Sequence, residues 1–195
     1  MSRHSRRSSG FLAFVAILAG VSLALGTSPA QEQKGGSYTK IPTVKGIEPL
    51  KVGDPAPDFL VKDLAGKEFR LKECCGKDAV LLFFWSFFCG PCREEMPMIN
   101  EMTKLYAGKG LQVIGVNLDG ADMKKAITKF VEAEKIGFRI VFDELVGDSF
   151  LVADPYGVAG TPALFIVDKA GKVAFSSLGA TTWPQLKEEI EKVVK

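Results

Sequence analysis

Four residues near the middle of the chain, Cys89-Gly90-Pro91-Cys92, have the types and the spacing for thiol chemistry. They follow the apolar run 79–88 and precede the stretch 93–106, where apolar residues recur at helical spacing. The first cysteine is therefore expected at a helix N-terminus, where unpaired backbone N–H groups and the helix dipole favour the thiolate. Proline is tolerated in the first turn of a helix, so Pro91 fits this place. The pattern predicts a redox-active dithiol.

Two other interpretations of the cysteine pair are weaker. A zinc site needs a second pair of ligands, and the chain offers only the adjacent Cys74 and Cys75 and a single histidine, His4. A purely structural disulfide would close a very short ring, and the stabilisation by a disulfide is expected to grow with the length of the loop. A Cys-x-x-Cys between a strand and a helix is instead typical of a redox site.

The segment around the pair resembles the thioredoxin superfamily, and within it the periplasmic TlpA/ResA-like thiol-disulfide oxidoreductases. The resemblance extends over residues 52–195. It rests on an aromatic-rich strand, the Cys-x-x-Cys motif and a charged helix interrupted by proline, which read FWSFFCGPCREEMP from Phe84 to Pro97. The family usually has tryptophan before the first cysteine, whereas this chain has Phe88, which keeps an aromatic ring but lacks the indole N–H donor.

The resemblance implies a thioredoxin-like α/β fold: a central mixed sheet with helices on both faces, an N-terminal hairpin and an extra helix-strand insert. It implies catalytic roles for Cys89, Cys92 and Glu95 and structural roles for Trp85 and Pro97. The superfamily also has a cis-proline where Thr161-Pro162 stands, although the residues alone would favour trans because only about one X-Pro bond in twenty is cis. The implied surface for binding an extended substrate by strand addition comprises Phe88, Gly90, Pro91, Thr161 and Pro162.

Glu95 follows Cys92 by three residues, so the two side chains share one face of the expected helix. The resemblance implies that a buried glutamate here acts in proton transfer. The alternative is a solvated helix carboxylate, and because Glu94 is adjacent, the sequence leaves open which of the two turns inward. The acid that plain thioredoxin has on the preceding strand corresponds to the apolar Phe83, so another group or water must accept the proton of the buried cysteine.

The N-terminal residues 1–30 have the pattern of a secretory signal peptide. Three arginines precede the uncharged apolar run 11–25, and Ser28-Pro29-Ala30 supplies small residues before a polar glutamine. The run is shorter than the roughly 20 residues that span a bilayer, and a retained membrane anchor is the alternative. The protein is thus expected to be periplasmic or otherwise exported, with a flexible arm over 31–51 and a thioredoxin-like domain over 52–195.

The charge and the missing histidine exclude several functions. Removal of residues 1–30 would take away the only histidine and three of the 25 basic residues, leaving 22 against 23 acidic ones. A chain without imidazole cannot use Ser-His or Cys-His nucleophile activation, histidine metal sites or histidine haem ligation. So small a net charge gives no electrostatic reason to expect nucleic-acid binding. Neither a metal nor an organic cofactor is expected.

Apolar patterns predict the elements that position the motif. A hairpin is expected from two short strands, 59–62 and 68–71, and further strands are expected at 79–85, 111–118, 138–142, 163–167 and 172–178. Helices are expected at 93–106, 122–135 and 183–194, with a helical turn at 148–156. The insert relative to plain thioredoxin is one helix and one strand between Cys92 and Pro162.

Cys74 and Cys75 receive no catalytic role. They lie before the strand 79–85, whereas Cys89 follows it, and about seven extended residues at roughly 3.3 Å each separate the two ends. A disulfide needs Cα atoms within about 7 Å, so these thiols cannot reach the motif. A vicinal disulfide, an intermolecular bridge and a metal contact remain open beside two non-catalytic thiols.

The predicted activity is thiol-disulfide exchange through a mixed disulfide, with Cys89 attacking and Cys92 resolving. The resemblance implies that the substrates are disulfides of exported proteins, such as apocytochrome c, and that a membrane thiol-electron transporter is the reductant. A peroxiredoxin-like peroxidase is one alternative, because that family shares the opening 53–59, but its P-x-x-x-T-x-x-C pattern would need proline and threonine where Leu82 and Ser86 stand. A non-enzymatic thioredoxin-fold adaptor is another alternative.

Overall fold

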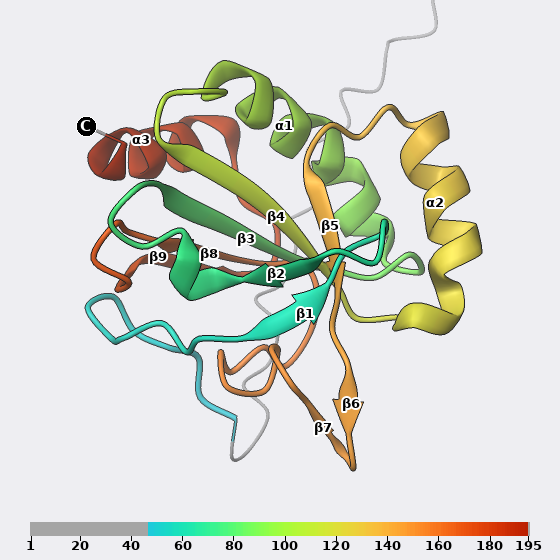
Figure 1. Cartoon of the computed structure of the whole chain (residues 1–195). Helices are drawn as coiled ribbons and strands as arrows, with labels where there is room; N and C mark the ends of the chain where they lie inside the picture. Colours follow the sequence, from blue (N-terminus) through green and yellow to red (C-terminus); the bar gives the residue numbers. More distant parts are fainter. Residues whose placement is uncertain (1–46, 195) are drawn as a thin grey trace, which may run out of the picture. The chain divides into compact units, whose positions relative to one another are not determined.

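A five-stranded mixed sheet lies at the centre of the domain (Figure 1). The computed structural model describes residues 47–194, so the expected signal peptide and most of the expected arm lie outside the described residues. The strands of the sheet, in spatial order, are β5 (Arg139–Phe142), β4 (Leu111–Asn117), β3 (Ala79–Trp85), β8 (Ala163–Val167) and β9 (Val173–Leu178). In the described part of the chain, no helix is long and apolar enough to cross a membrane.

β3 is the central strand, and all seven of its residues are buried. A run of apolar residues without alternation is typical of a strand that is covered on both faces. β4 runs parallel to β3 and pairs Asn117 with Trp85, whereas β8 runs antiparallel and pairs Ala163 with Phe84. The carboxyl ends of β3 and β4 and the start of β8 therefore meet at one edge of the sheet.

All three α-helices pack against the same face of the sheet, which corrects the expectation of helices on both faces. The buried cluster on this face combines side chains of α1 (Gly90–Leu105), α2 (Lys124–Ala133) and α3 (Trp183–Val193). The chain steps from β3 to β4 and on to β5 in one direction, through parallel crossovers. Such crossovers are right-handed in almost all proteins, so α1 and α2 must lie on the same side.

The opposite face is covered without any α-helix among the described residues. Its buried cluster contains the hairpin of β1 (Leu60–Lys62) and β2 (Glu68–Arg70), the 3-10 helix η1 (Leu71–Glu73) and the turn 151–157. Tyr156 is fully buried there, and its hydroxyl donates to the Pro57 carbonyl at 3.0 Å. The predicted N-terminal hairpin is confirmed, and in Figure 1 it crosses in front of the sheet.

Two local expectations differ from the structure. The expected helical turn 148–156 begins later, because β6 (Leu145–Val146) and β7 (Ser149–Phe150) form a small hairpin around Gly147, whose φ is +66°. The expected helix 122–135 begins as the 3-10 helix η2 (Ala121–Met123) before α2.

The last residues of the expected flexible arm, 31–51, lie against the domain. Leu50 donates its N–H to the Tyr156 carbonyl at 3.3 Å, and its own carbonyl accepts from the Ser176 hydroxyl at 3.3 Å. Gly157, at φ +68°, leaves no room for a Cβ beside the backbone of Glu48 and Pro49. Residues 48–50 are therefore packed against the domain.

Candidate active site

The two cysteines of the motif differ in their access to solvent. They form a disulfide with a Cα–Cα distance of 5.3 Å at the start of α1. Cys89 is the N-cap, and its sulfur accepts the Cys92 N–H at 3.2 Å. Cys89 is partly exposed, whereas Cys92 is fully buried in the helix-side core. A thiolate on Cys89 would thus face both solvent and the positive end of the helix dipole.

Glu95, and not Glu94, turns inward from α1. The Glu95 side chain is only 6% exposed, and Glu94 lies on the exposed surface. The backbone N–H of Thr181 donates to Oε1 of Glu95 at 2.9 Å, while Oε2 is buried and has no hydrogen-bond partner among the described residues. Burial raises the pKa of Glu95 from 4.5 to about 7, against the opposing effect of the Thr181 hydrogen bond. A carboxyl group with this pKa can both accept and release a proton near neutral pH.

The Thr161-Pro162 peptide bond is cis, as the resemblance implied. β8 begins at the next residue, and its Ala163 pairs with Phe84 near the end of β3. The segment before β8 therefore lies at the edge of the sheet from which the loop to Cys89 departs. Pro162 is buried, and Thr161 is partly exposed.

An exposed aromatic ring stands directly before the redox pair. Phe88 is 75% exposed and packs edge-on against Phe87, which in turn packs edge-on against Phe130 of α2. The guanidinium of Arg93 lies 5.2 Å from the ring centre of Phe130 and 5.9 Å from that of Phe87. A cleft of about 500 Å³ lies between α1 and α2, and Gly90, Arg93 and Phe130 are among the residues that line it.

The remaining predicted positions lie close to the motif or in the core beneath it. Gly90 and Pro91 form the first turn of α1, and Pro97 lies inside that helix. Trp85 is fully buried at the end of β3, and its ring packs against Phe130 at a centroid distance of 6.0 Å. The structural roles of Trp85 and Pro97 remain predictions.

Cys74 and Cys75 are free thiols. Cys74 is buried on the hairpin side of the sheet, and burial raises the pKa of its thiol. Cys92 belongs to the cluster on the other face. The structure thus places the second cysteine pair away from the redox pair.

Two participants in the site were not predicted. Thr181 contacts Glu95 through its backbone N–H, which no side-chain pattern reveals. Asp119 follows β4 and contacts the loop between β3 and α1. A polar signal was present for Asp119, because Asn117-Leu118-Asp119 ends an apolar strand that was expected to lie in the sheet.

A partly exposed cysteine at a helix N-terminus, a buried partner cysteine and a buried carboxyl group on a thioredoxin-like fold define a thiol-disulfide oxidoreductase. A sequence model of the AhpC/TSA family matches residues 52–176. The chain belongs to this family of thioredoxin-like proteins.

Curated relatives and solved structures agree on the activity. The thiol-disulfide oxidoreductase ResA of Bacillus thuringiensis subsp. konkukian is 37% identical over 146 residues, which cover 75% of this chain and 80% of that protein. ResA of Geobacillus thermodenitrificans is 37% identical over 144 residues, covering 74% and 79% of the two chains. The thioredoxin domain of a thiol-disulfide oxidoreductase from Bacteroides vulgatus is 28% identical, with a TM-score of 0.63, and the match covers 75% of this chain and 99% of that one.

The family match includes the opening 53–59 on which the peroxidase alternative depended. The relatives that align over three quarters of the chain are nevertheless named thiol-disulfide oxidoreductases. Ser86, which stands where the peroxidase pattern needs threonine, bonds to Asp119. The protein is a thiol-disulfide oxidoreductase.

Proposed function

We propose that the protein reduces disulfides of exported proteins, with apocytochrome c as a substrate class. The observation that carries the proposal is the unequal exposure of the two cysteines, Cys89 partly exposed and Cys92 fully buried. An exposed sulfur can be reached by a disulfide on another protein, whereas a buried sulfur can react only with its neighbour. This asymmetry suits an attacking and a resolving cysteine.

The reaction begins from the reduced dithiol. The Cys89 thiolate attacks one sulfur of the substrate disulfide, and the other substrate sulfur leaves as a thiolate. The Cys92 thiol then loses its proton and attacks Cys89, so that the second substrate sulfur leaves. The dithiol of the protein is oxidised to the Cys89–Cys92 disulfide, and the substrate gains two thiols and two electrons.

Glu95 is the proposed acceptor of the Cys92 proton. It shares the buried face of α1 with Cys92, and its Oε2 has no partner among the described residues. Its pKa of about 7 lets the ionised form accept a proton and the neutral form return it to a leaving thiolate. Residues 47–194, which the structure describes, contain no histidine that could accept this proton.

An extended substrate segment is proposed to bind beside the cis-proline. The backbone before β8 lies at the same sheet edge as the redox loop, which suits strand addition. The exposed ring of Phe88 supplies an apolar contact next to the reacting sulfur. The full proposed surface consists of Phe88, Gly90, Pro91, Thr161 and Pro162.

Export is proposed from the pattern in residues 1–30, and a membrane thiol-electron transporter is the proposed reductant. In an oxidising compartment the dithiol must be regenerated after each turnover. Expression of the full chain, cell fractionation and N-terminal sequencing test this part. We expect an exported protein that begins near Gln31, and a cytoplasmic protein with an intact N-terminus would contradict it.

The reduction potential and a trapped intermediate test the reductase proposal. Equilibration of Cys89–Cys92 with a glutathione series should give a potential near or below about −270 mV, and a value near −120 mV would indicate an oxidase instead. Cys92→Ser should accumulate a mixed disulfide with substrate, whereas Cys89→Ser should not.

The apocytochrome part needs its own comparison. A disulfide-bonded Cys-x-x-Cys-His peptide carries the haem-attachment motif and should react faster than insulin. Equal rates would remove apocytochrome c from the proposal and leave the reductase activity standing. Turnover of hydrogen peroxide at the rate of disulfide exchange would favour the peroxidase alternative.

A further inference from the structure

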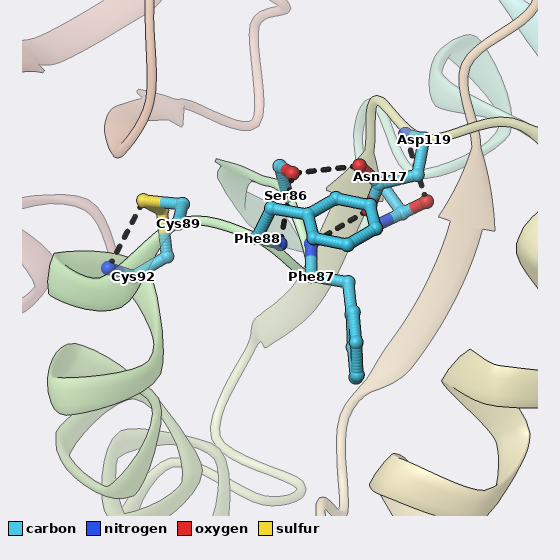
Figure 2. Close-up of a disulfide and its surroundings, with 7 residues drawn as sticks. All are labelled: Ser86, Phe87, Phe88, Cys89, Cys92, Asn117 and Asp119. Carbon is cyan, nitrogen blue, oxygen red and sulfur yellow. Dashed lines mark hydrogen bonds between the residues drawn. A yellow bond between two sulfur atoms is a disulfide. The ribbon is translucent and has the colours of Figure 1, made fainter.

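The loop that leads into the redox motif is held by a carboxylate from the neighbouring strand end. The Ser86 hydroxyl donates to Oδ1 of Asp119 at 2.6 Å, and the Phe87 N–H donates to Oδ2 at 2.6 Å. The Ser86 hydroxyl also accepts the Phe88 N–H at 3.1 Å. Figure 2 shows these contacts next to the Cys89–Cys92 disulfide. Each residue between β3 and Cys89 is therefore tied, directly or through Ser86, to Asp119.

Asp119 is itself fixed by the strand that it follows. β3 and β4 run parallel and pair Trp85 with Asn117, so their following loops emerge side by side. The fully buried Asn117 donates from Nδ2 to Oδ2 of Asp119 at 2.8 Å and accepts the Asp119 N–H at 3.1 Å. The Leu118 N–H donates to the Trp85 carbonyl at 3.0 Å, which joins the two loops once more.

The contacts of the loop determine what it presents to a substrate. The Cys89 N–H donates to the Ser86 carbonyl at 3.1 Å, so the backbone at Ser86 also fixes the N-cap of α1. Phe88, whose ring is 75% exposed, has its N–H held by the Ser86 hydroxyl. The position of the attacking sulfur and the direction of the exposed ring therefore both depend on one three-residue segment.

We infer that Asp119 is a positioning residue for thiol-disulfide exchange: its carboxylate fixes Ser86 and Phe87 and thereby aims Cys89 and Phe88 at a protein substrate. Both of its oxygens already accept hydrogen bonds, Oδ1 from Ser86 and Oδ2 from Phe87 and Asn117. Asp119 is thus built to hold the loop, whereas Glu95 has an oxygen open for a proton.

Removing the carboxylate should slow the reaction with a protein more than the reaction with a small molecule. In Asp119→Ala the Phe87 N–H and the Ser86 hydroxyl lose their acceptor, and the loop gains alternative conformations. A small aromatic disulfide can approach Cys89 from many directions, whereas a protein disulfide must dock on Phe88 as well. Misplacement by about 1 Å can cost up to a hundredfold in rate, and we expect the rate with insulin to fall by about tenfold.

The isosteric variant Asp119→Asn should restore the rate. Its amide oxygen can accept the Phe87 N–H and the Asn117 Nδ2–H, and its NH2 group can donate to the Ser86 oxygen, which has a second lone pair for the Phe88 N–H. The loop is then held without the negative charge. Asp122→Ala is the matched control, because Asp122 is an exposed acid three residues further along the same connection.

The experiment compares the second-order rates of the reduced variants with insulin and with a small aromatic disulfide, each measured well below its melting temperature. We expect a selective loss with insulin for Asp119→Ala, near wild-type rates for Asp119→Asn, and no change for Asp122→Ala. Ser86→Ala should also be slow, and Ser86→Ala/Asp119→Ala should be no slower than Asp119→Ala alone, since the two groups act as a unit.

Three outcomes would overturn the inference. One is an unchanged ratio of the insulin rate to the small-disulfide rate in Asp119→Ala, which would leave only a stabilising role. Another is an Asp119→Asn variant that reacts with insulin as slowly as Asp119→Ala, which would show that the rate depends on the negative charge of Asp119 and not on its hydrogen bonds. The third is strict additivity of the Ser86 and Asp119 substitutions. If Asp119→Ala does not fold, the ratio of the insulin rate to the small-disulfide rate is measured in Ser86→Ala and Asp119→Asn instead. A lowered ratio in Ser86→Ala and a normal ratio in Asp119→Asn then support the inference, and an unchanged ratio in Ser86→Ala overturns it.

Discussion

Replacing Glu95 by glutamine should change how the stability of the oxidised protein depends on pH. The Glu95 carboxyl is buried, and burial raises its pKa from 4.5 to about 7. Below pH 4.5, the Glu95 carboxyl is protonated in both the folded and the unfolded chain. As the pH rises through this window the unfolded chain releases the proton first, so the wild type loses stability. The loss is complete at about pH 8, one unit above the folded pKa.

The size of the effect follows from the two pKa values. The difference between 4.5 and about 7 corresponds to about 3 kcal/mol, because each pKa unit is worth about 1.4 kcal/mol. Glutamine cannot ionise, and its amide oxygen can still accept the Thr181 N–H that now contacts Oε1. Glu95→Gln should therefore gain up to about 3 kcal/mol over the wild type in alkaline solution. Any cost of burying the amide is independent of pH.

Urea denaturation of the two oxidised proteins measures this difference across the pH range. The free energies of unfolding should differ by a constant amount near pH 4 and diverge between about pH 5 and pH 8. The Cys89–Cys92 disulfide keeps both thiols from titrating, and Glu94→Gln is the control because that carboxylate is adjacent but exposed. If the difference in the free energy of unfolding between the wild type and Glu95→Gln does not change with pH, the raised pKa that burial gives Glu95 is refuted.

Three further substitutions or labelling experiments test the site and its support. In the reduced protein at neutral pH, Cys89 should be alkylated before the buried Cys92, as mass mapping would show; equal rates would contradict the assigned roles. Gly115→Ala should lower the stability by about 1–3 kcal/mol in thermal or urea unfolding, because its Cβ would stand 2.6 Å from a buried isoleucine methyl and 2.9 Å from a buried phenylalanine ring carbon. Gly90→Ala, where a Cβ meets nothing within 4 Å, is the control. Gly157→Ala should displace the segment 48–49, which limited proteolysis would detect as new cleavage there; an unchanged digest would show that this segment is not docked.

The sequence predicted the parts of the fold that depend on local patterns. The apolar run of β3, the helical spacing in α1 and the hairpin of β1 and β2 are each legible from a few consecutive residues. The distribution of helices over the two faces is a global property. It depends on the direction in which β3, β4 and β5 follow one another, and a pattern of separate elements does not give that direction.

The cysteine pair could be predicted because its residue types and spacing carry the signal, whereas the role of Glu95 was implied by the family resemblance. The structure adds that Glu95 is the inward member of its pair, since this depends on the rotation of α1 against the loop before α3. Asp119 stands at a polar strand end that the sequence shows, but its contacts could not be predicted, because its partners Ser86 and Phe87 are 33 and 32 residues away in the chain. Only the register that pairs Trp85 with Asn117 brings them together.

The two carboxyl groups near the motif, Asp119 and Glu95, differ in how many hydrogen-bond donors contact them. Asp119 accepts from a hydroxyl, a backbone N–H and a side-chain amide, so its two oxygens hold three groups of the surrounding loops in place. Glu95 accepts one backbone N–H at Oε1, and its Oε2 is buried without a partner among the described residues, so Oε2 can take a proton without breaking a contact. Exchange needs both properties, because the loop must stay fixed while the buried thiol loses its proton. The proposed roles therefore predict that substitutions at the two sites affect different steps: docking for Asp119, at the end of β4, and resolution for Glu95, on α1.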